Sequence, residues 1–99
     1  MARFDVYLNK EGQGCLLDVQ ADILCHLNTR LVVPLLPQAQ APQPAQHLNP
    51  CFAIAGESLV MATQFMAAVP AGILDTPLTD LRQHRHEIVA AIDFLLQGF

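Results

Sequence analysis

Hydrophobic and polar residues alternate near the start of the chain. Every second residue from Phe4 to Leu8 is apolar, and the residues between them include Asp5 and Tyr7. This period predicts a half-buried strand over Arg3–Leu8. The polar, glycine-containing segment Asn9–Gly14 follows, and Cys15–Val19 is again apolar. Together the two apolar segments predict a β-hairpin with a long loop.

The next strand is predicted after a polar connector. The connector Gln20–Thr29 carries two adjacent apolar residues, Ile23 and Leu24. Arg30–Leu36 is the run richest in β-branched and aliphatic residues, which predicts a third strand. Pro34 lies inside this run and has no N–H to donate to a neighbouring strand. It therefore indicates an edge position, a bulge or a bend.

The segment Pro37–Pro50 is rich in proline and glutamine and has little to bury, so it is expected to be a long loop within one domain spanning residues 1–99. Neither side of this loop could build a core alone. Beyond it, the short apolar runs Cys51–Ala55 and Ser58–Thr63 predict a hairpin around Gly56-Glu57. The apolar segment Gln64–Val69 and a turn-rich segment, Pro70–Pro77, lead to the C-terminal region.

The end of the chain has helical periodicity. Pro77 precedes it, Thr79 or Asp80 is the expected N-cap with Gln83 completing a weak capping box, and Gly98 is the expected stop. The apolar residues of the expected inner face are Leu81, Ile88, Ile92, Leu95 and Phe99. Strands first and a helix last predict an α+β domain with a largely antiparallel sheet. The apolar terminal residue, Phe99, is expected either in the core or against a partner.

Composition narrows the possible functions. Hydrophobic residues make up 53% of the 99 residues and charged residues only 14%, which favours a homodimer that hides apolar surface. The net charge is −4, and the five Lys and Arg residues are scattered, so no nucleic-acid binding by the chain alone is expected. No apolar run is long enough to span a membrane, and the N-terminus does not resemble a signal peptide. A cytoplasmic location is therefore expected.

The residues that could carry chemistry do not form a recognisable set. Cys15, Cys25 and Cys51 are odd in number and lack CxxC spacing, so buried or half-buried free thiols are expected without zinc or disulfides. His84 and His86 are two residues apart on the predicted helix and cannot form a paired ligand face. His84 is expected to be partly buried, and His86 and Glu87 to be solvated.

The carboxylates Asp18 and Asp22 lie around the end of the second predicted strand, where they are expected to accept hydrogen bonds from backbone N–H groups. No GxSxG, P-loop or GxGxxG motif occurs. We therefore expect a protein that is not an enzyme and has no catalytic residues, no metal site and no cofactor.

Five segments in order resemble the CcdB family of toxins from bacterial toxin–antitoxin pairs: RFDVY, LDVQADIL, RLVVPL, MATQFMAAVP and EIVAAIDFLLQGF. The resemblance implies a small SH3-like barrel with a long C-terminal helix, assembled as a homodimer. It also implies binding to the A subunit of DNA gyrase, so that the cleaved gyrase–DNA complex is trapped, and neutralisation by a cognate CcdA-type antitoxin.

The resemblance also implies two groups of site residues. The gyrase-binding group is Ile23, Leu24, Asp93, Leu96, Gln97, Gly98 and Phe99. Gly98 matches the family, whereas Asp93 replaces an asparagine, Gln97 a tryptophan and Phe99 a terminal isoleucine. The antitoxin-binding group is the first hairpin loop: Asn9, Lys10, Glu11, Gly12, Gln13 and Gly14.

Two alternative functions remain open. The chain could fold, dimerise and bind an antitoxin without poisoning gyrase, an alternative motivated by Asp93 and Gln97. It could also be a ribonuclease toxin of the same fold type. Such an enzyme needs basic residues to hold RNA and an acid–base pair to activate the ribose hydroxyl, and an isoelectric point near 5.3 argues against it.

Overall fold

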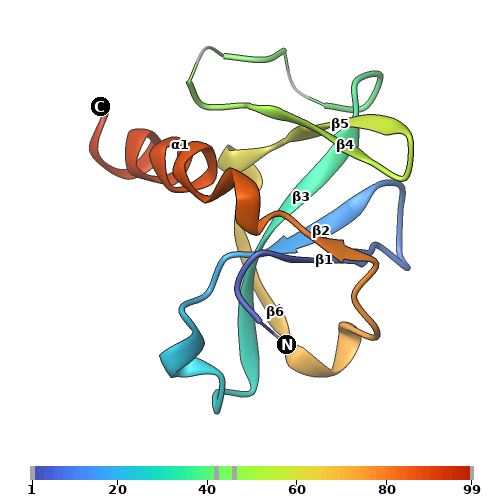
Figure 1. Ribbon diagram of the computed structural model, residues 1–99, viewed down its shortest axis with the longest axis vertical. Helices are drawn as coiled ribbons and strands as arrows, with labels where there is room; N and C mark the ends of the chain where they lie inside the picture. The colour runs from blue at the N-terminus through green and yellow to red at the C-terminus, as the bar shows by residue number, and fades with distance from the viewer. Residues whose placement is uncertain (1, 42, 46, 99) are drawn as a thin grey trace.

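A computed structural model describes residues 2–41, 43–45 and 47–98 of the chain. Figure 1 shows an antiparallel sheet curved into a nearly closed barrel, with one helix at the C-terminal end. The strands are β1 (Asp5–Leu8), β2 (Cys15–Asp18), β3 (Thr29–Pro37), β4 (Cys51–Ile54), β5 (Glu57–Met61), β6 (Ala67–Pro70) and β7 (Thr79–Asp80). Helix α1 spans Arg85–Gln97, and four 3-10 turns complete the fold: η1 (Asp22–Leu24), η2 (Thr63–Phe65), η3 (Ala71–Ile73) and η4 (Arg82–His84).

The order of the strands is β4-β5-β3-β2-β1-β7, with β6 beside the first half of β3. Every pairing is antiparallel. The α+β class and the SH3-like barrel with a C-terminal helix are thus confirmed. The main core lies between the concave face of the sheet and α1, which contributes the fully buried Ile88 and Ala91.

The first strand is buried on both faces, which corrects the prediction of a half-buried strand. Val6 belongs to the main core, whereas its neighbour Tyr7 packs with Val32 and Leu74 in a second cluster. Alternation places successive side chains on opposite faces of a strand. The alternation along the sequence cannot show that η3 and the segment after it cover the outer face of β1. Leu8, expected to face inward, is 59% exposed.

Pro34 lies in a central strand, so the edge position suggested by the sequence is wrong. On one side of β3, β2 pairs continuously with residues that include Pro34. On the other side, β6 pairs with Thr29–Val32 and β5 with Leu35–Pro37. The Pro34 carbonyl accepts a hydrogen bond from the Ala62 N–H at 2.9 Å on this second side. The missing N–H therefore falls at the gap between β5 and β6, where no ladder bond is lost.

The hairpin between β4 and β5 is confirmed. Ile54 pairs with Glu57, so Ala55 and Gly56 form a two-residue loop. Both loop residues have positive φ, 52° and 82°, as a type I′ turn requires.

Helix α1 begins later than its hydrophobic pattern predicts. Thr79 and Asp80, the expected N-caps, form strand β7 and pair with Val6 and Asp5 of β1. This pairing covers an edge of β1 that the helix would have left open. Leu81 is buried as predicted, but it lies outside the helix. The predicted stop is confirmed: Gly98 has φ 80°, and its N–H donates to the Phe94 carbonyl at 2.8 Å.

The long loop after β3 is held at its far end. The Asn49 side chain is buried, and its amide nitrogen donates to the Met61 carbonyl at 2.9 Å and to Gln64 Oε1 at 2.7 Å.

Within the described part of the chain, no helix has the length and apolar character needed to cross a membrane.

Candidate functional site

The last turns of α1 carry most of the predicted gyrase-binding residues. Asp93, Leu96 and Gln97 are three to four residues apart, so they share one side of the helix, and all three are exposed. Leu96 is 70% exposed although it is a large apolar residue. Gly98 closes the helix behind them, and Phe99 lies outside the described residues. The opposite side of the helix is anchored in the core, so the exposed end has a rigid base.

Ile23 and Leu24 form a second exposed apolar area on η1. Ile23 is 84% exposed and Leu24 40% exposed. Nearby, Leu27 and Leu31 are also exposed, at 41% and 37%. Exposed apolar residues that gather in one segment are typical of surfaces that bind a partner.

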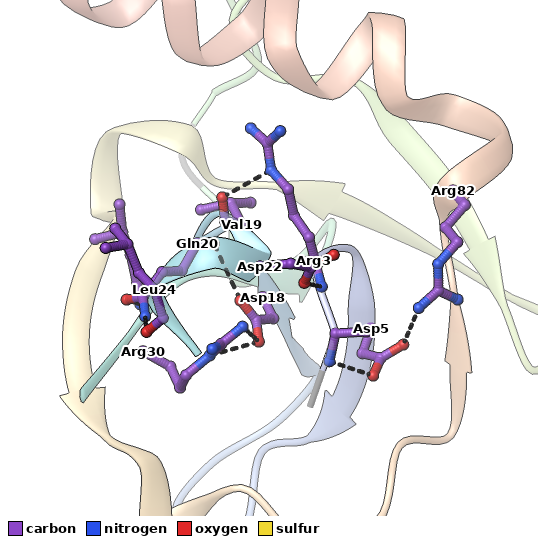
Figure 2. A network of polar contacts seen from close by, with 11 residues as sticks. Arg3, Asp5, Asp18, Val19, Gln20, Asp22, Leu24, Arg30 and Arg82 are labelled. Atoms are coloured by element: carbon purple, nitrogen blue, oxygen red, sulfur yellow. Dashed lines mark hydrogen bonds and ion pairs between the residues drawn. The ribbon is translucent and has the colours of Figure 1, made fainter. Parts of the chain in front are cut away.

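Side-chain hydrogen bonds fix the position of η1 (Figure 2). The Gln20 side chain donates to the Leu24 carbonyl and accepts from the Leu31 N–H, both at 3.1 Å. The Gln20 N–H in turn donates to Asp18 Oδ1 at 3.0 Å. From the other side, the Arg3 N–H donates to Asp22 Oδ1 at 2.8 Å. The connector is thus an ordered platform for its two apolar side chains.

The two areas are separate within one chain. In Figure 1, η1 lies at the lower left of the molecule, and the C-terminal end of α1 lies at the upper left. Neither the sequence nor the fold of a single chain brings Ile23 and Leu24 next to Asp93, Leu96 and Gln97.

The predicted antitoxin loop joins β1 to β2, as expected from the sequence. The Asn9 N–H donates a hydrogen bond of 3.2 Å to the Gly14 carbonyl, and this bond closes the turn. Lys10 forms an ion pair with Asp75, so the one basic residue of the loop is shared with the segment after η3. A shallow cavity of about 200 Å³ lies beside the loop, and its lining residues are Leu8, Asn9, Lys10, Glu11, Leu16 and Ile73.

Two histidines lie at the start of the C-terminal helical region, His84 in η4 and His86 in α1. His84 is half-buried, as predicted; its ring lies 5.0 Å from that of Phe52, and its Nδ1 lies 3.2 Å from Glu87 Oε1. His86 is exposed, as expected. Among the described residues, no group of three or more His, Cys, Asp and Glu side chains is placed to hold a metal ion.

All three cysteines are free, but the predicted burial is correct only for Cys15. Cys15 is buried, and burial raises its pKa, whereas Cys25 and Cys51 are exposed. Cys25 follows η1 on the surface. Cys51 lies on β4, whose alternate residues Phe52 and Ile54 point into the core, so Cys51 faces outward.

The predicted backbone contacts of Asp18 and Asp22 are present, but the main partner of Asp18 was missed. Asp18 forms a buried ion pair with Arg30, whose Nε donates to Asp18 Oδ2 at 2.8 Å. Burial raises the pKa of Asp18, although the hydrogen bonds from Arg30 and the Gln20 N–H oppose this effect. The sequence predicted Arg30 only as the first residue of a strand, because no local signal shows that this strand begins inside the fold with Arg30 buried.

The comparison with protein families matches residues 3–98 to the family described as CcdB protein. The chain belongs to the CcdB family. A comparison with curated protein sequences finds no match. Among solved structures, the chain is similar to an endoribonuclease in complex with its cognate antitoxin from Mycobacterial species. The TM-score is 0.73 at 14% identity, over 97% of this chain and 94% of that chain. At this identity the similarity supports the fold of the CcdB-family chain and not a shared activity.

Proposed function

We propose that this CcdB-family protein is the toxin of a type II toxin–antitoxin pair and acts on DNA gyrase. In this proposal it binds the A subunit and traps the cleaved gyrase–DNA complex. Family membership over residues 3–98 supports the proposal. The observation that carries it is the exposure of Leu96 at 70% on the end of a helix whose other face is anchored in the core by Ile88 and Ala91. A rigid, apolar projection loses little conformational entropy on binding.

The proposed action requires no chemistry from the protein itself. Gyrase cleaves the DNA, and the toxin stabilises the cleaved state by binding to it, so the protein is not an enzyme in this proposal. The contact area is the exposed end of α1 together with Ile23 and Leu24 on η1. Asp93 and Gln97 border Leu96 and supply hydrogen-bonding groups at the edge of the apolar contact.

We further propose a homodimer and a CcdA-type antitoxin as partners. Ten large apolar side chains of the described residues are at least 37% exposed, and four of them, Ile23, Leu24, Leu27 and Leu31, lie in one segment of the chain, as is typical of a surface that binds a partner. A two-fold dimer presents two copies of each contact area, so that areas separated within one chain can act together on one target. The antitoxin is proposed to contact the Asn9–Gly14 loop.

A gyrase cleavage assay tests the proposal. Purified protein is added to gyrase and supercoiled DNA, and linear DNA is measured after the complex is denatured. We expect linear DNA to accumulate with the full chain. We expect little linear DNA with a chain that lacks Gly98 and Phe99, or with the Leu96→Asp variant. Leu78→Asp is the matched control, because Leu78 is 54% exposed and lies before β7, away from both contact areas. Circular dichroism confirms that each variant is folded.

Unchanged DNA at saturating protein would contradict gyrase poisoning. If the protein nevertheless dimerises and binds its antitoxin, the non-poisoning alternative is correct. The ribonuclease alternative is motivated by the endoribonuclease of similar fold. Cleavage of RNA by pure protein, with DNA cleavage by gyrase unaffected, would establish that alternative instead.

A further inference from the structure

A cavity lies between the N-terminal segment, the connector and the start of α1. It borders η1, which carries Ile23 and Leu24, and its lining does not include the C-terminal end of α1. Its volume is about 440 Å³, within the range of small-molecule sites. Its lining residues are Arg3, Phe4, Ala21, Asp22, Arg82 and Arg85. Three of the five Lys and Arg residues of an acidic chain therefore meet at one cavity.

The three guanidinium groups differ in what already binds them. Arg82 lies 3.2 Å from Asp5 and 2.9 Å from Asp80, so two carboxylates compensate its charge. The Arg3 Nε donates a hydrogen bond to the Val19 carbonyl at 3.1 Å, and the terminal nitrogens of Arg3 form no hydrogen bond to a described residue. Arg85 forms no ion pair with any described residue and is exposed. Two arginines are thus available to an anion.

The Arg3 side chain is held in place. Its Cζ lies 4.7 Å from the ring centroid of Phe4, over the face of the ring. Phe4 is buried and has φ 74°, a conformation that is costly for a bulky residue. Hydrogen bonds on both sides impose it: the Phe4 N–H donates to the Asp18 carbonyl, and the Phe4 carbonyl accepts from the Leu81 N–H. Figure 2 shows the Arg3 guanidinium extending away from Asp22.

We propose that this cavity binds a phosphate-bearing ligand of nucleotide size. A phosphate has enough oxygen atoms to accept hydrogen bonds from two guanidinium groups at once, whereas a single arginine fork satisfies a carboxylate. Arg3 and Arg85 bind the phosphate. One carboxylate oxygen of Asp22 accepts a hydrogen bond from the Arg3 backbone N–H at 2.8 Å. Its other oxygen accepts a hydrogen bond from a hydroxyl or amino group of the ligand, which places the rest of the molecule along the cavity.

Isothermal titration calorimetry with three probes tests the site: adenosine 5′-monophosphate, adenosine and inorganic phosphate. We expect the monophosphate to bind with about tenfold higher affinity than adenosine, because charge-assisted hydrogen bonds to phosphate are lost without it. Inorganic phosphate should compete with the monophosphate. Arg85→Gln and Arg3→Gln should each lower the affinity for the monophosphate by about tenfold.

Lys10→Gln is the matched control, because it removes one exposed positive charge on the opposite hairpin loop and leaves the cavity intact. Arg85 is exposed at the start of α1, so Arg85→Gln remains informative even if Arg3→Gln unfolds the protein. The proposal is wrong if adenosine binds as well as its monophosphate, if Arg85→Gln binds like the wild type, or if neither phosphate compound binds at millimolar concentration. None of these results depends on gyrase, so the site and the proposed function are tested independently.

Discussion

Asp18 and Arg30 form an ion pair that is shielded from water on all sides. The two side chains are 0% and 1% exposed, and Arg30 Nη2 lies 2.6 Å from Asp18 Oδ2. The pair connects the end of β2 to the start of β3, the two strands joined by the connector that carries Ile23 and Leu24. Asp18 Oδ1 also accepts a hydrogen bond from the Gln20 N–H. A buried pair of this kind costs a great deal when one partner is removed, because the remaining charge has no water to solvate it.

Removal of Arg30 should destabilise the protein strongly. Arg30→Met leaves the Asp18 carboxylate buried without a cation, and we expect the free energy of unfolding at neutral pH to fall by about 3–5 kcal/mol. Urea denaturation measures this change. The double variant Asp18→Asn/Arg30→Met should recover most of the loss, because the uncompensated charge is gone. An equal loss in both variants would show that Arg30 stabilises the fold by packing alone.

The same variant should depend on pH in a defined direction. Burial raises the pKa of Asp18 above 3.8, and the loss of Arg30 removes groups that lower it. Between 3.8 and the raised pKa, the folded state binds more protons than the unfolded state, so the free energy of unfolding falls as pH increases. Arg30→Met should therefore lose less stability in mildly acidic solution than at neutral pH. A deficit that does not change with pH would contradict this assignment.

Tyr7 should ionise only above its usual range. It is the single tyrosine of the chain, is 1% exposed, and its hydroxyl has no hydrogen-bond partner among the described residues. Burial raises its pKa above 10.0, and Asp5 and Asp18 add to this effect. Its contribution to stability is present below pH 10.0 and is lost as pH rises through the raised pKa. Tyrosinate absorbance of the native protein should rise later than that of the urea-unfolded chain, and coincident titrations would contradict the prediction.

Gly14 should tolerate no side chain. Its φ is 81°, and a Cβ atom there would lie 2.1 Å from the Leu35 carbonyl oxygen, which belongs to the backbone of the central strand. Gly56 has a similar φ of 82°, with nothing within 4 Å of a Cβ atom. Gly56→Ala should therefore cost about 1–2 kcal/mol from the left-handed conformation alone. Gly14→Ala should cost clearly more. Equal midpoints of urea denaturation for the two variants would contradict the steric argument.

Gln20 should control the order of the connector. Gln20→Ala removes the acceptor of the Leu31 N–H and the donor to the Leu24 carbonyl. We expect a loss of about 1–2 kcal/mol in the free energy of unfolding, since two partly buried backbone groups are left without their partner. Hydrogen exchange at the Leu31 amide should accelerate more than at amides of the β4–β5 hairpin. A uniform acceleration would indicate only global destabilisation.

The sequence predicted many elements correctly because their signals are local. The β1–β2 and β4–β5 hairpins and the stop at Gly98 follow from periodicity and from glycine at positions with positive φ. Periodicity also placed Leu95 on the inner face of the helix, but Leu95 is 37% exposed. The start of α1 was predicted wrongly because Thr79 and Asp80 have the composition of a cap. The free edge of β1, which is distant in the sequence, determines that they form a strand instead.

The sequence by itself determined the class of fold and the residues that end the helix and turn the hairpins, because these features depend on neighbouring residues and on apolar periodicity. It also determined the family, through segments that resemble the family in order along nearly the whole chain. Only the tertiary structure decided that β1 is covered on both faces, that Arg30 is buried with Asp18, and that Arg3, Arg82 and Arg85 line one cavity. Each of these depends on segments that are far apart in the chain, and no local pattern encodes the environment that a distant segment provides.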